Sequence, residues 1–201
     1  MNQILSYTAA AVAGYLLGSV STGLIVAKKS SHVDLRQEGS KSTGATNVLR
    51  VLGKKPAAIT FVGDFIKVLL AMVIGSLLIG QYGAMVGGLA GIIGHNWPVY
   101  HQFKGGKGVA SSVAVMLYVF PVYGLISLLF FFALVALTKY ISLGSMAMLA
   151  LFALLVILFN WGNLFVCVWA VAVAALCIYR HRANIGRLLK GTENKLSLKS
   201  K

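Results

Sequence analysis

Four long apolar runs alternate with short polar segments along this chain. The runs cover residues 4–27, 56–94, 109–138 and 141–179. Because a membrane-spanning helix takes about 20 residues, the first run predicts one helix and each of the others predicts a pair. Turn-forming residues mark the middle of each pair: Gly80 to Gly83, Pro121, and Asn160 to Asn163. The pattern predicts an all-α bundle of seven transmembrane helices in a single domain, residues 1–201.

The run at 109–138 allows a second interpretation. Its length gives two helices of about 15 residues each, whereas membrane spans usually have about 17–25. If this run is a re-entrant segment, five spans remain. Seven spans is the prediction and five is the alternative.

The basic residues lie on one side of the predicted bundle. Seven lie between the first two runs, two in the segment 95–108, one at Lys139 and seven after Tyr179; Lys67 alone falls inside a predicted span. Because Lys and Arg favour cytoplasmic loops, we expect the N-terminus outside and the C-terminus in the cytoplasm. No basic residue precedes the first run, which favours a true span over a signal peptide.

Composition supports a membrane protein and excludes two other classes. The chain is 58% hydrophobic and 11% charged, with a mean hydropathy of +0.84. This is too apolar for a disordered chain and more apolar than typical soluble domains. The net charge of +14 sits in clusters that flank apolar runs, so we expect no nucleic-acid partner. Cys167 and Cys177 both lie inside the last run and fit neither a metal site nor a disulfide framework.

The first polar segment, residues 34–50, is rich in glycine, hydroxyl groups and arginine. Glycines expose backbone N–H groups, and hydroxyls with arginine complete a cradle for phosphate. Ser42 or Thr43 is a candidate cap for a short helix that runs to Arg50. The alternative is an ordinary basic cytoplasmic loop.

The second polar segment ends in Lys104-Gly105-Gly106-Lys107-Gly108, directly before an apolar run. Backbone donors, two ammonium groups and a following helix N-terminus favour an anion. The chain contains no G-x-x-x-x-G-K-[ST] motif, so ATP hydrolysis is not implied. His95 is either a base or a polar residue at a helix boundary.

The third polar segment continues the last apolar run as a helix to about Lys190. His181 and Asn184 are three residues apart and therefore share a helix face. Glu193, the only acid after residue 64, is a candidate partner for a loop arginine. The alternative is a basic stop signal at the membrane surface.

Taken together, the three segments resemble the signatures of the bacterial acyl-phosphate–glycerol-3-phosphate acyltransferases, in order and over nearly the whole chain. The matching residues are Gly18-Ser19 with Asp34-Leu35-Arg36, Gly39-Ser40, Gly44-Ala45-Thr46-Asn47 and Arg50; Gly94-His95, Pro98 and Phe103 to Val109; and His181-Arg182, Asn184-Ile185, Arg187-Leu188 and Gly191-Thr192-Glu193. Two departures stand out. Ser21 replaces a common proline, and Lys41-Ser42 replaces the usual Gly-Asn in the first signature.

The resemblance implies transfer of a fatty acyl group from acyl phosphate to the 1-hydroxyl of glycerol 3-phosphate, which gives lysophosphatidic acid and phosphate. It implies a monomer in the bacterial inner membrane, among membrane lipid, with its site on the cytoplasmic side and with no cofactor and no metal. A transporter of a phosphorylated metabolite is the alternative, although transporters usually place polar groups near the midplane.

The resemblance also implies roles for individual residues. Phosphate ligands are expected among Ser40, Arg50, Lys104, Gly105, Gly106, Lys107 and Gly108, with Thr46, Asn47 and Ser142 as further substrate contacts. His181 and Asn184 are expected to orient the glycerol hydroxyl. The proton acceptor is either His181 or a substrate phosphate, because no His-x-x-x-x-Asp motif occurs. We expect Asp64 and Lys67 to form a structural pair in the second span.

Overall fold

The computed structural model describes residues 2–31 and 33–196, and all regular secondary structure within them is helical. This confirms the all-α prediction. The chain divides into two compact units, Met1–Val119 and Phe120–Lys201, which are described one at a time.

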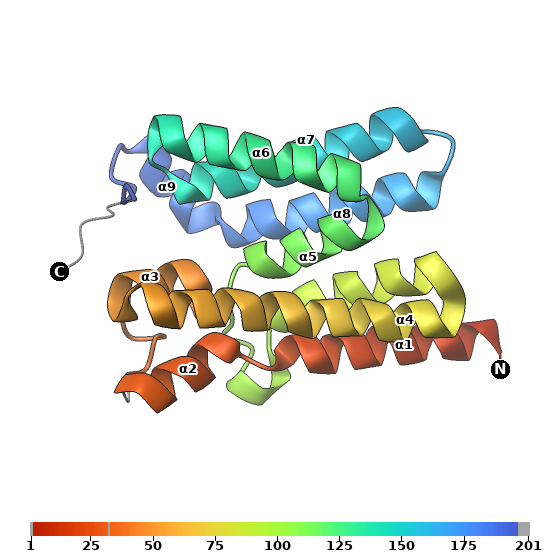
Figure 1. Ribbon diagram of the computed structural model, residues 1–201, viewed down its shortest axis with the longest axis horizontal. Coiled ribbons are helices and arrows are strands. Elements are labelled where there is room, and N and C mark those ends of the chain that lie inside the picture. The colour runs from red at the N-terminus through yellow and green to blue at the C-terminus, as the bar shows by residue number, and fades with distance from the viewer. Residues whose placement is uncertain (1, 32, 197–201) are drawn as a thin grey trace. The chain divides into compact units, whose positions relative to one another are not determined.

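Unit 1 is a helical unit centred on one long hairpin. Its elements are α1 (Gln3–Ser19), α2 (Thr22–Ser31), α3 (Ala45–Leu52), α4 (Lys54–Asn96), the 3-10 helix η1 (Val99–His101) and α5 (Val109–Val119). Ile79 and Gly80 leave the helical conformation, Gly80 with a φ of 66°, so α4 folds into two arms (Figure 1). The predicted helix pair with a turn near Gly80 is therefore present.

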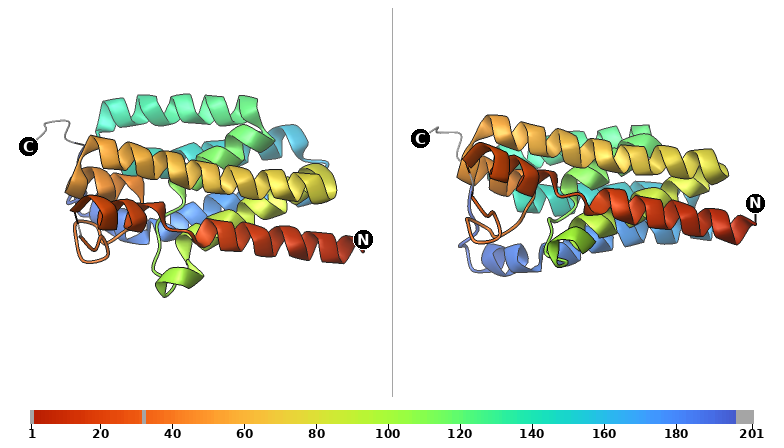
Figure 2. Two further views of the ribbon diagram at one scale, coloured as in Figure 1. Left: turned by 60° about the horizontal axis from the view of Figure 1, so that its bottom comes forward. Right: turned by 90° about the horizontal axis from the view of Figure 1, so that it is seen from below.

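Helix α1 lies along α4 in every view (Figures 1 and 2). A Cβ on Gly18 would overlap the backbone of Gly91, and one on Gly14 would overlap the backbone of Gly87. Gly14 and Gly18 are four residues apart on α1, and Gly87 and Gly91 are four residues apart on α4. This small-xxx-small pattern lets helices meet at backbone distance in membranes. Glycine at these positions sets how closely α1 approaches the second arm of α4.

The first apolar run differs from the prediction because it is two helices. Helix α1 ends at Ser19 and α2 begins at Thr22, with Val20 extended at φ −66° and ψ 114°. The hydrophobic pattern carries no trace of this break, since Val20 and its neighbours are apolar or small. The contact that stabilises the break comes from α4 and is described with the site.

Unit 2 holds the remaining four helices: α6 (Pro121–Thr138), α7 (Ile141–Asn160), α8 (Leu164–Arg180) and α9 (Arg182–Leu189). Pro121 occupies the first turn of α6, where its missing N–H costs nothing. Asn163 caps α8 by accepting a hydrogen bond from the Val166 N–H. Both breaks thus lie where the turn-forming residues predicted them.

The tail helix also differs from the prediction of one continuous helix to Lys190. Helices α8 and α9 meet at His181 with a bend of 60°. Helix α9 ends at Leu189, and Gly191 takes a left-handed φ of 67°. His181 therefore lies at a corner of the backbone.

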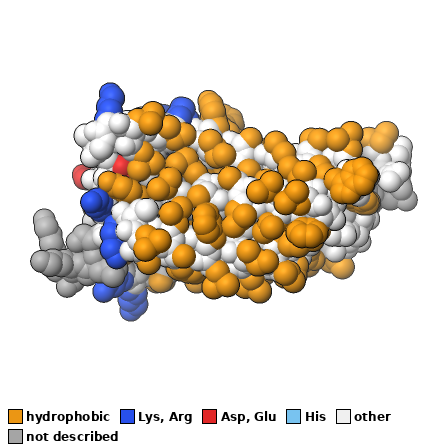
Figure 3. All heavy atoms as spheres, turned by 90° about the horizontal axis from the view of Figure 1, so that it is seen from above, with side chains coloured by type: hydrophobic (Ala, Val, Ile, Leu, Met, Phe, Trp, Pro, Cys, Tyr) orange, Lys and Arg blue, Asp and Glu red, His pale blue; other side chains and the backbone are white. Residues whose placement is uncertain are grey.

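Four helical segments within the described residues are long and apolar enough to cross a membrane: Gln3–Ser31, Lys54–His101, Pro121–Thr138 and Ile141–Asn160. The bent pair α8–α9 gives a fifth if it counts as one span. Large apolar side chains are exposed along these helices, as at Leu129 and Phe132 of α6, and hydrophobic side chains cover most of the face in Figure 3. The seven-span arrangement remains a prediction.

Candidate active site

The loop between α2 and α3, residues 33–44, is organised around the buried side chain of Asn47. The Asn47 Oδ1 accepts a hydrogen bond from the Ser40 N–H at 2.8 Å. Its amide nitrogen donates to three carbonyls, those of Leu35, Glu38 and Ser42, at 3.3, 3.0 and 2.9 Å. Asn47 was predicted as a substrate ligand; its side chain instead fixes the shape of this loop through these four hydrogen bonds.

Apolar packing also holds the same loop in place. Leu35 and Val48 are fully buried with Ala27 and Ala57 in a small apolar cluster. This cluster joins the loop and α3 to α2 and α4. Ser40 is half-exposed, and Thr46 and Arg50 are exposed on α3, so these three predicted residues are accessible at the surface of the loop and of α3.

The cap of α3 differs from the prediction. Gly44 occupies the N-cap position without a side-chain cap, and the helix continues past Arg50 to Leu52. Lys41, which stands where the resembling family usually has glycine, takes a left-handed φ of 57°. A side chain in this conformation costs about 1–2 kcal/mol, so the departure at Lys41 stores backbone strain.

A hollow of about 360 Å³ lies beside this loop, with Lys28, Asp34, Arg36 and His101 among its lining residues. Arg36 donates to both carboxylate oxygens of Asp34, through Nε at 3.0 Å and Nη2 at 2.9 Å. These hydrogen bonds lower the pKa of Asp34 from its usual value, so Asp34 stays ionised and neutralises Arg36.

The glycine-lysine loop, residues 104–108, is tightly packed rather than flexible. A Cβ on Gly105 would overlap the His95 carbonyl, and one on Gly106 would overlap the His95 ring. Gly108 has a φ of 76°, and a Cβ there would lie 3.0 Å from the Asn96 Oδ1. All three glycines are buried. Glycine is required at these positions because the loop backbone approaches the end of α4 too closely for a side chain.

The charge of this loop faces outward. Lys104 is exposed and Lys107 is half-buried, and α5 begins at Val109 directly after Gly108. The first N–H groups of a helix carry partial positive charge and favour anions. Two ammonium groups beside a helix N-terminus therefore suit a phosphate.

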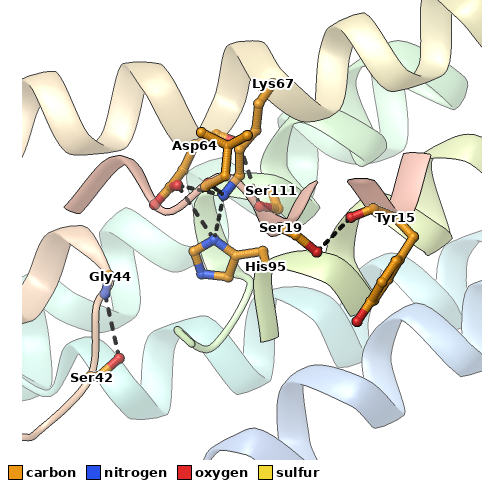
Figure 4. A network of polar contacts seen from close by, with 9 residues as sticks. Tyr15, Ser19, Ser42, Gly44, Asp64, Lys67, His95 and Ser111 are labelled. Atoms are coloured by element: carbon orange, nitrogen blue, oxygen red, sulfur yellow. Dashed lines mark hydrogen bonds and ion pairs between the residues drawn. The ribbon is translucent and has the colours of Figure 1, made fainter. Parts of the chain in front are cut away.

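Three buried ionisable side chains of α4 point toward one another (Figure 4). We call Asp64, Lys67 and His95 the buried triad. The Lys67 Nζ lies 2.9 Å from the Asp64 Oδ1 and 3.1 Å from the His95 Nδ1. The spacing i, i+3 predicted the Asp64–Lys67 pair, which is confirmed. His95 joins it from the other arm of α4, which no local spacing could reveal.

In unit 2 the centre of the polar contacts is Glu193. One carboxylate oxygen accepts from the Ser142 hydroxyl at 2.8 Å and from the Asn184 amide at 2.7 Å, and the other accepts from Arg187 Nε at 2.6 Å. Burial raises the pKa of Glu193, but the hydrogen bonds from Asn184, Ser142 and Arg187 outweigh it and lower the pKa from its usual value.

These contacts revise one sequence-based expectation. The arginine partner of Glu193 is Arg187 on α9 rather than an arginine of the first loop. Ser142 and Asn184, both predicted site residues, are thus held by one carboxylate.

His181, the predicted hydroxyl-orienting residue, is 3% exposed. Its Nδ1 lies 2.8 Å from the Cys177 carbonyl oxygen. A carbonyl only accepts hydrogen bonds, so Nδ1 carries the hydrogen and, in the neutral ring, Nε2 is the acceptor. The geometry therefore suits His181 to accept a hydrogen bond from a hydroxyl.

Helices of this length and apolarity place the chain among the all-helical integral membrane proteins, with loops that suit a phosphate-bearing ligand. The family model described as glycerol-3-phosphate acyltransferase matches residues 8–191. The chain belongs to this family of acyltransferases.

Curated relatives cover almost the whole chain. The glycerol-3-phosphate acyltransferase of Clostridioides difficile (strain 630) is 46% identical and covers 98% of both chains. That of Thermoanaerobacter sp. (strain X514) is 45% identical over 94% of this chain and 96% of its own.

The solved structures of PlsY, an integral membrane glycerol 3-phosphate acyltransferase, are also similar. The glycerol 3-phosphate form has a TM-score of 0.89 and 38% identity, and the lysophosphatidic acid form has 0.86 and 36%. Each comparison covers 96% of both chains.

Proposed function

We propose that this chain transfers a fatty acyl group from acyl phosphate to the 1-hydroxyl of glycerol 3-phosphate, and so forms lysophosphatidic acid and phosphate. The observation that carries this proposal is the similarity to PlsY in its glycerol 3-phosphate form over 96% of both chains. The geometry of the two loops in unit 1 and of His181 in unit 2 supports it.

The phosphate groups are bound by cations and hydroxyl groups of unit 1 and by the N-terminus of α5. Ser40 and Arg50 lie at the surface of the segment that Asn47 holds rigid, with Thr46 beside them. Lys104 and Lys107 flank Gly105, Gly106 and Gly108 at the N-terminus of α5. Fixed donors of this kind position a substrate and stabilise charge that develops on the leaving phosphate.

We expect His181 to orient the hydroxyl. The Nε2 of His181 accepts the hydrogen bond of the 1-hydroxyl, and Asn184 and Ser142 are held in place by Glu193. The hydroxyl oxygen attacks the acyl carbon, and the bond from this carbon to the phosphate oxygen breaks. Phosphate leaves, and the hydroxyl proton passes to one of its oxygens. Because phosphate is a good leaving group, the reaction needs little help from a protein base.

The direct test is phosphate release from palmitoyl phosphate by the purified protein in detergent. We expect release that depends on glycerol 3-phosphate, with lysophosphatidic acid formed in equal amount. Palmitoyl-CoA in place of palmitoyl phosphate tests the choice of donor. Absence of product with palmitoyl phosphate, together with product from palmitoyl-CoA, would refute the proposed donor.

The proposal includes a topology. We place the protein as a seven-span monomer in the bacterial inner membrane, with the N-terminus outside and the phosphate-binding loops in the cytoplasm, because Lys and Arg favour that side. Single cysteines at Gln81, Pro121 and Asn163, in a variant with Cys167 and Cys177 replaced by alanine, should react with an impermeant thiol reagent from outside. Reaction from the cytoplasmic side alone at any of them would contradict this topology there.

A further inference from the structure

The buried triad contains more contacts than the ion pair between Asp64 and Lys67 alone. Asp64 is 1% exposed, Lys67 7% and His95 6%, and buried charges are costly unless each is paired and hydrogen-bonded. The cluster joins three separate segments of unit 1: the first arm of α4, the end of its second arm, and the α1–α2 break (Figure 4).

The ammonium group of Lys67 is surrounded by acceptors. It donates to the Val20 carbonyl at 2.6 Å, the group that the break between α1 and α2 releases from helical hydrogen bonding. It also lies 2.9 Å from the Asp64 Oδ1 and 3.1 Å from the His95 Nδ1. A lysine ammonium has three hydrogens and no lone pair, so three acceptor atoms match its three hydrogens.

This match determines the protonation of the His95 ring. Lys67 can only donate, so the Nδ1 of His95 must accept and carries no hydrogen. The competing contact, from Nδ1 to the Asp64 Oδ1, is longer at 3.4 Å. In the neutral ring the hydrogen is then on Nε2, which is the nitrogen that faces the glycine-lysine loop.

The His95 ring is also the surface against which the glycine-lysine loop packs. The Gly106 N–H donates to the His95 carbonyl at 3.1 Å, and the Cα of Gly106 lies so close to Nε2 that a Cβ would overlap it. A ring that turned would therefore displace the backbone of Gly106.

We infer that Lys67 is a positioning residue, which acts through His95 to hold the glycine-lysine loop in its phosphate-binding conformation. Lys67 holds the ring as the Nε2–H tautomer, and the Asp64 carboxylate pairs with the Lys67 ammonium group at 2.9 Å. The same ammonium stabilises the α1–α2 break, so one side chain couples the end of α1 to the loop. The kinetic part of this inference rests on the proposed function; the tautomer does not.

The first test is the tautomer itself. The chain has four histidines, and a 15N-histidine spectrum of the purified protein separates protonated from unprotonated ring nitrogens. The His95 signals are identified by their loss in His95→Gln. We expect an unprotonated Nδ1 and a protonated Nε2. A protonated Nδ1 would show that His95 donates to Asp64 and would overturn the inference.

The second test removes the charges together. A single Lys67 variant leaves an uncompensated buried carboxylate and is expected to fold poorly, so the informative variant is Asp64→Asn with Lys67→Met. We expect the Nδ1–H form of His95 to appear, and KM for glycerol 3-phosphate to rise on the order of ten- to a hundredfold, while KM for palmitoyl phosphate changes less. Lys55→Met, the same change at an exposed position of α4, should alter neither.

A matched pair at His95 separates positioning from simple filling of space. Glutamine places an amide near the Nε2 position, and asparagine places one near Nδ1. His95→Gln should retain more affinity for glycerol 3-phosphate than His95→Asn. An unchanged tautomer or an unchanged KM in the double variant would refute the role of Lys67. Wild-type protein without acyltransferase activity would refute the proposed function and leave the spectrum as the test of the inference.

Discussion

Glu193 provides the sharpest test of how unit 2 holds its predicted site residues. Its side chain is 3% exposed and accepts hydrogen bonds from Ser142, Asn184 and Arg187. Glu193→Gln keeps an oxygen for Ser142 and Asn184 but places an NH2 group against the Nε–H of Arg187. The variant therefore loses one charge-assisted hydrogen bond and keeps two contacts.

The expected cost follows from these contacts. A hydrogen bond to a charged group contributes about 1.5–3 kcal/mol, and water at the one-third exposed Arg187 reduces this to about 1–2 kcal/mol. Glu193→Ala also removes the acceptor for Ser142 and Asn184, which are both buried, and should cost about 3–5 kcal/mol. Glu38→Gln, the same change at an exposed position, should cost less than about 0.5 kcal/mol.

The effect of Glu193→Gln should depend on pH in one direction. The pKa of Glu193 in the folded protein lies below its usual value of 4.5, so the unfolded chain binds more protons in this range. The stabilisation by the carboxylate is then complete above pH 4.5 and is lost as the pH falls through the folded pKa. The gap between wild type and Glu193→Gln should narrow as the pH falls below 4.5.

The assay is unfolding in detergent micelles by added sodium dodecyl sulfate, followed by circular dichroism at several pH values. The order of stability should be wild type, Glu193→Gln, Glu193→Ala at neutral pH. A Gln variant within about 0.5 kcal/mol of wild type, or a gap that does not change with pH, would refute the assignment of Glu193 as an ionised, buried acceptor.

Three further predictions concern the loops and His181. Lys41→Gly should relieve the left-handed backbone and raise the free energy of unfolding by about 0.5–1 kcal/mol, whereas Lys41→Ala should give no gain; equal effects would exclude backbone strain. Gly106→Ala forces a Cβ into the His95 ring at a cost of about 1–3 kcal/mol and should raise KM for glycerol 3-phosphate more than KM for palmitoyl phosphate; an equal rise counts against a glycerol 3-phosphate site. His181→Gln should retain far more activity than His181→Ala. A plot of the rate of His181→Gln against pH should show no titration near pH 6.5, the usual pKa of histidine. Two equally inactive variants that still bind glycerol 3-phosphate would make His181 the base, since a general base contributes about 10²–10⁴-fold.

Many of the helices and turns can be predicted from short stretches of the sequence. Runs of apolar residues predict helices for a membrane. Gly80 and Pro121 end or begin helices through their backbone conformation, and Asn163 begins one through its side-chain cap. The glycine-lysine loop is also local, because its glycines and ammonium groups are consecutive. For these features, the residues that predict each element lie within one short stretch of the chain.

The sites in their detail required the tertiary structure. Lys67 contacts residues 28 and 47 positions away, at His95 and Val20, and Glu193 contacts Ser142 from 51 positions away. The break after Ser19 has no local signal, because the lysine that stabilises it belongs to another helix. Hydrophobic periodicity decides which residues leave water, but which buried polar groups pair depends on where the packed helices bring them, since each must find its partner inside the fold.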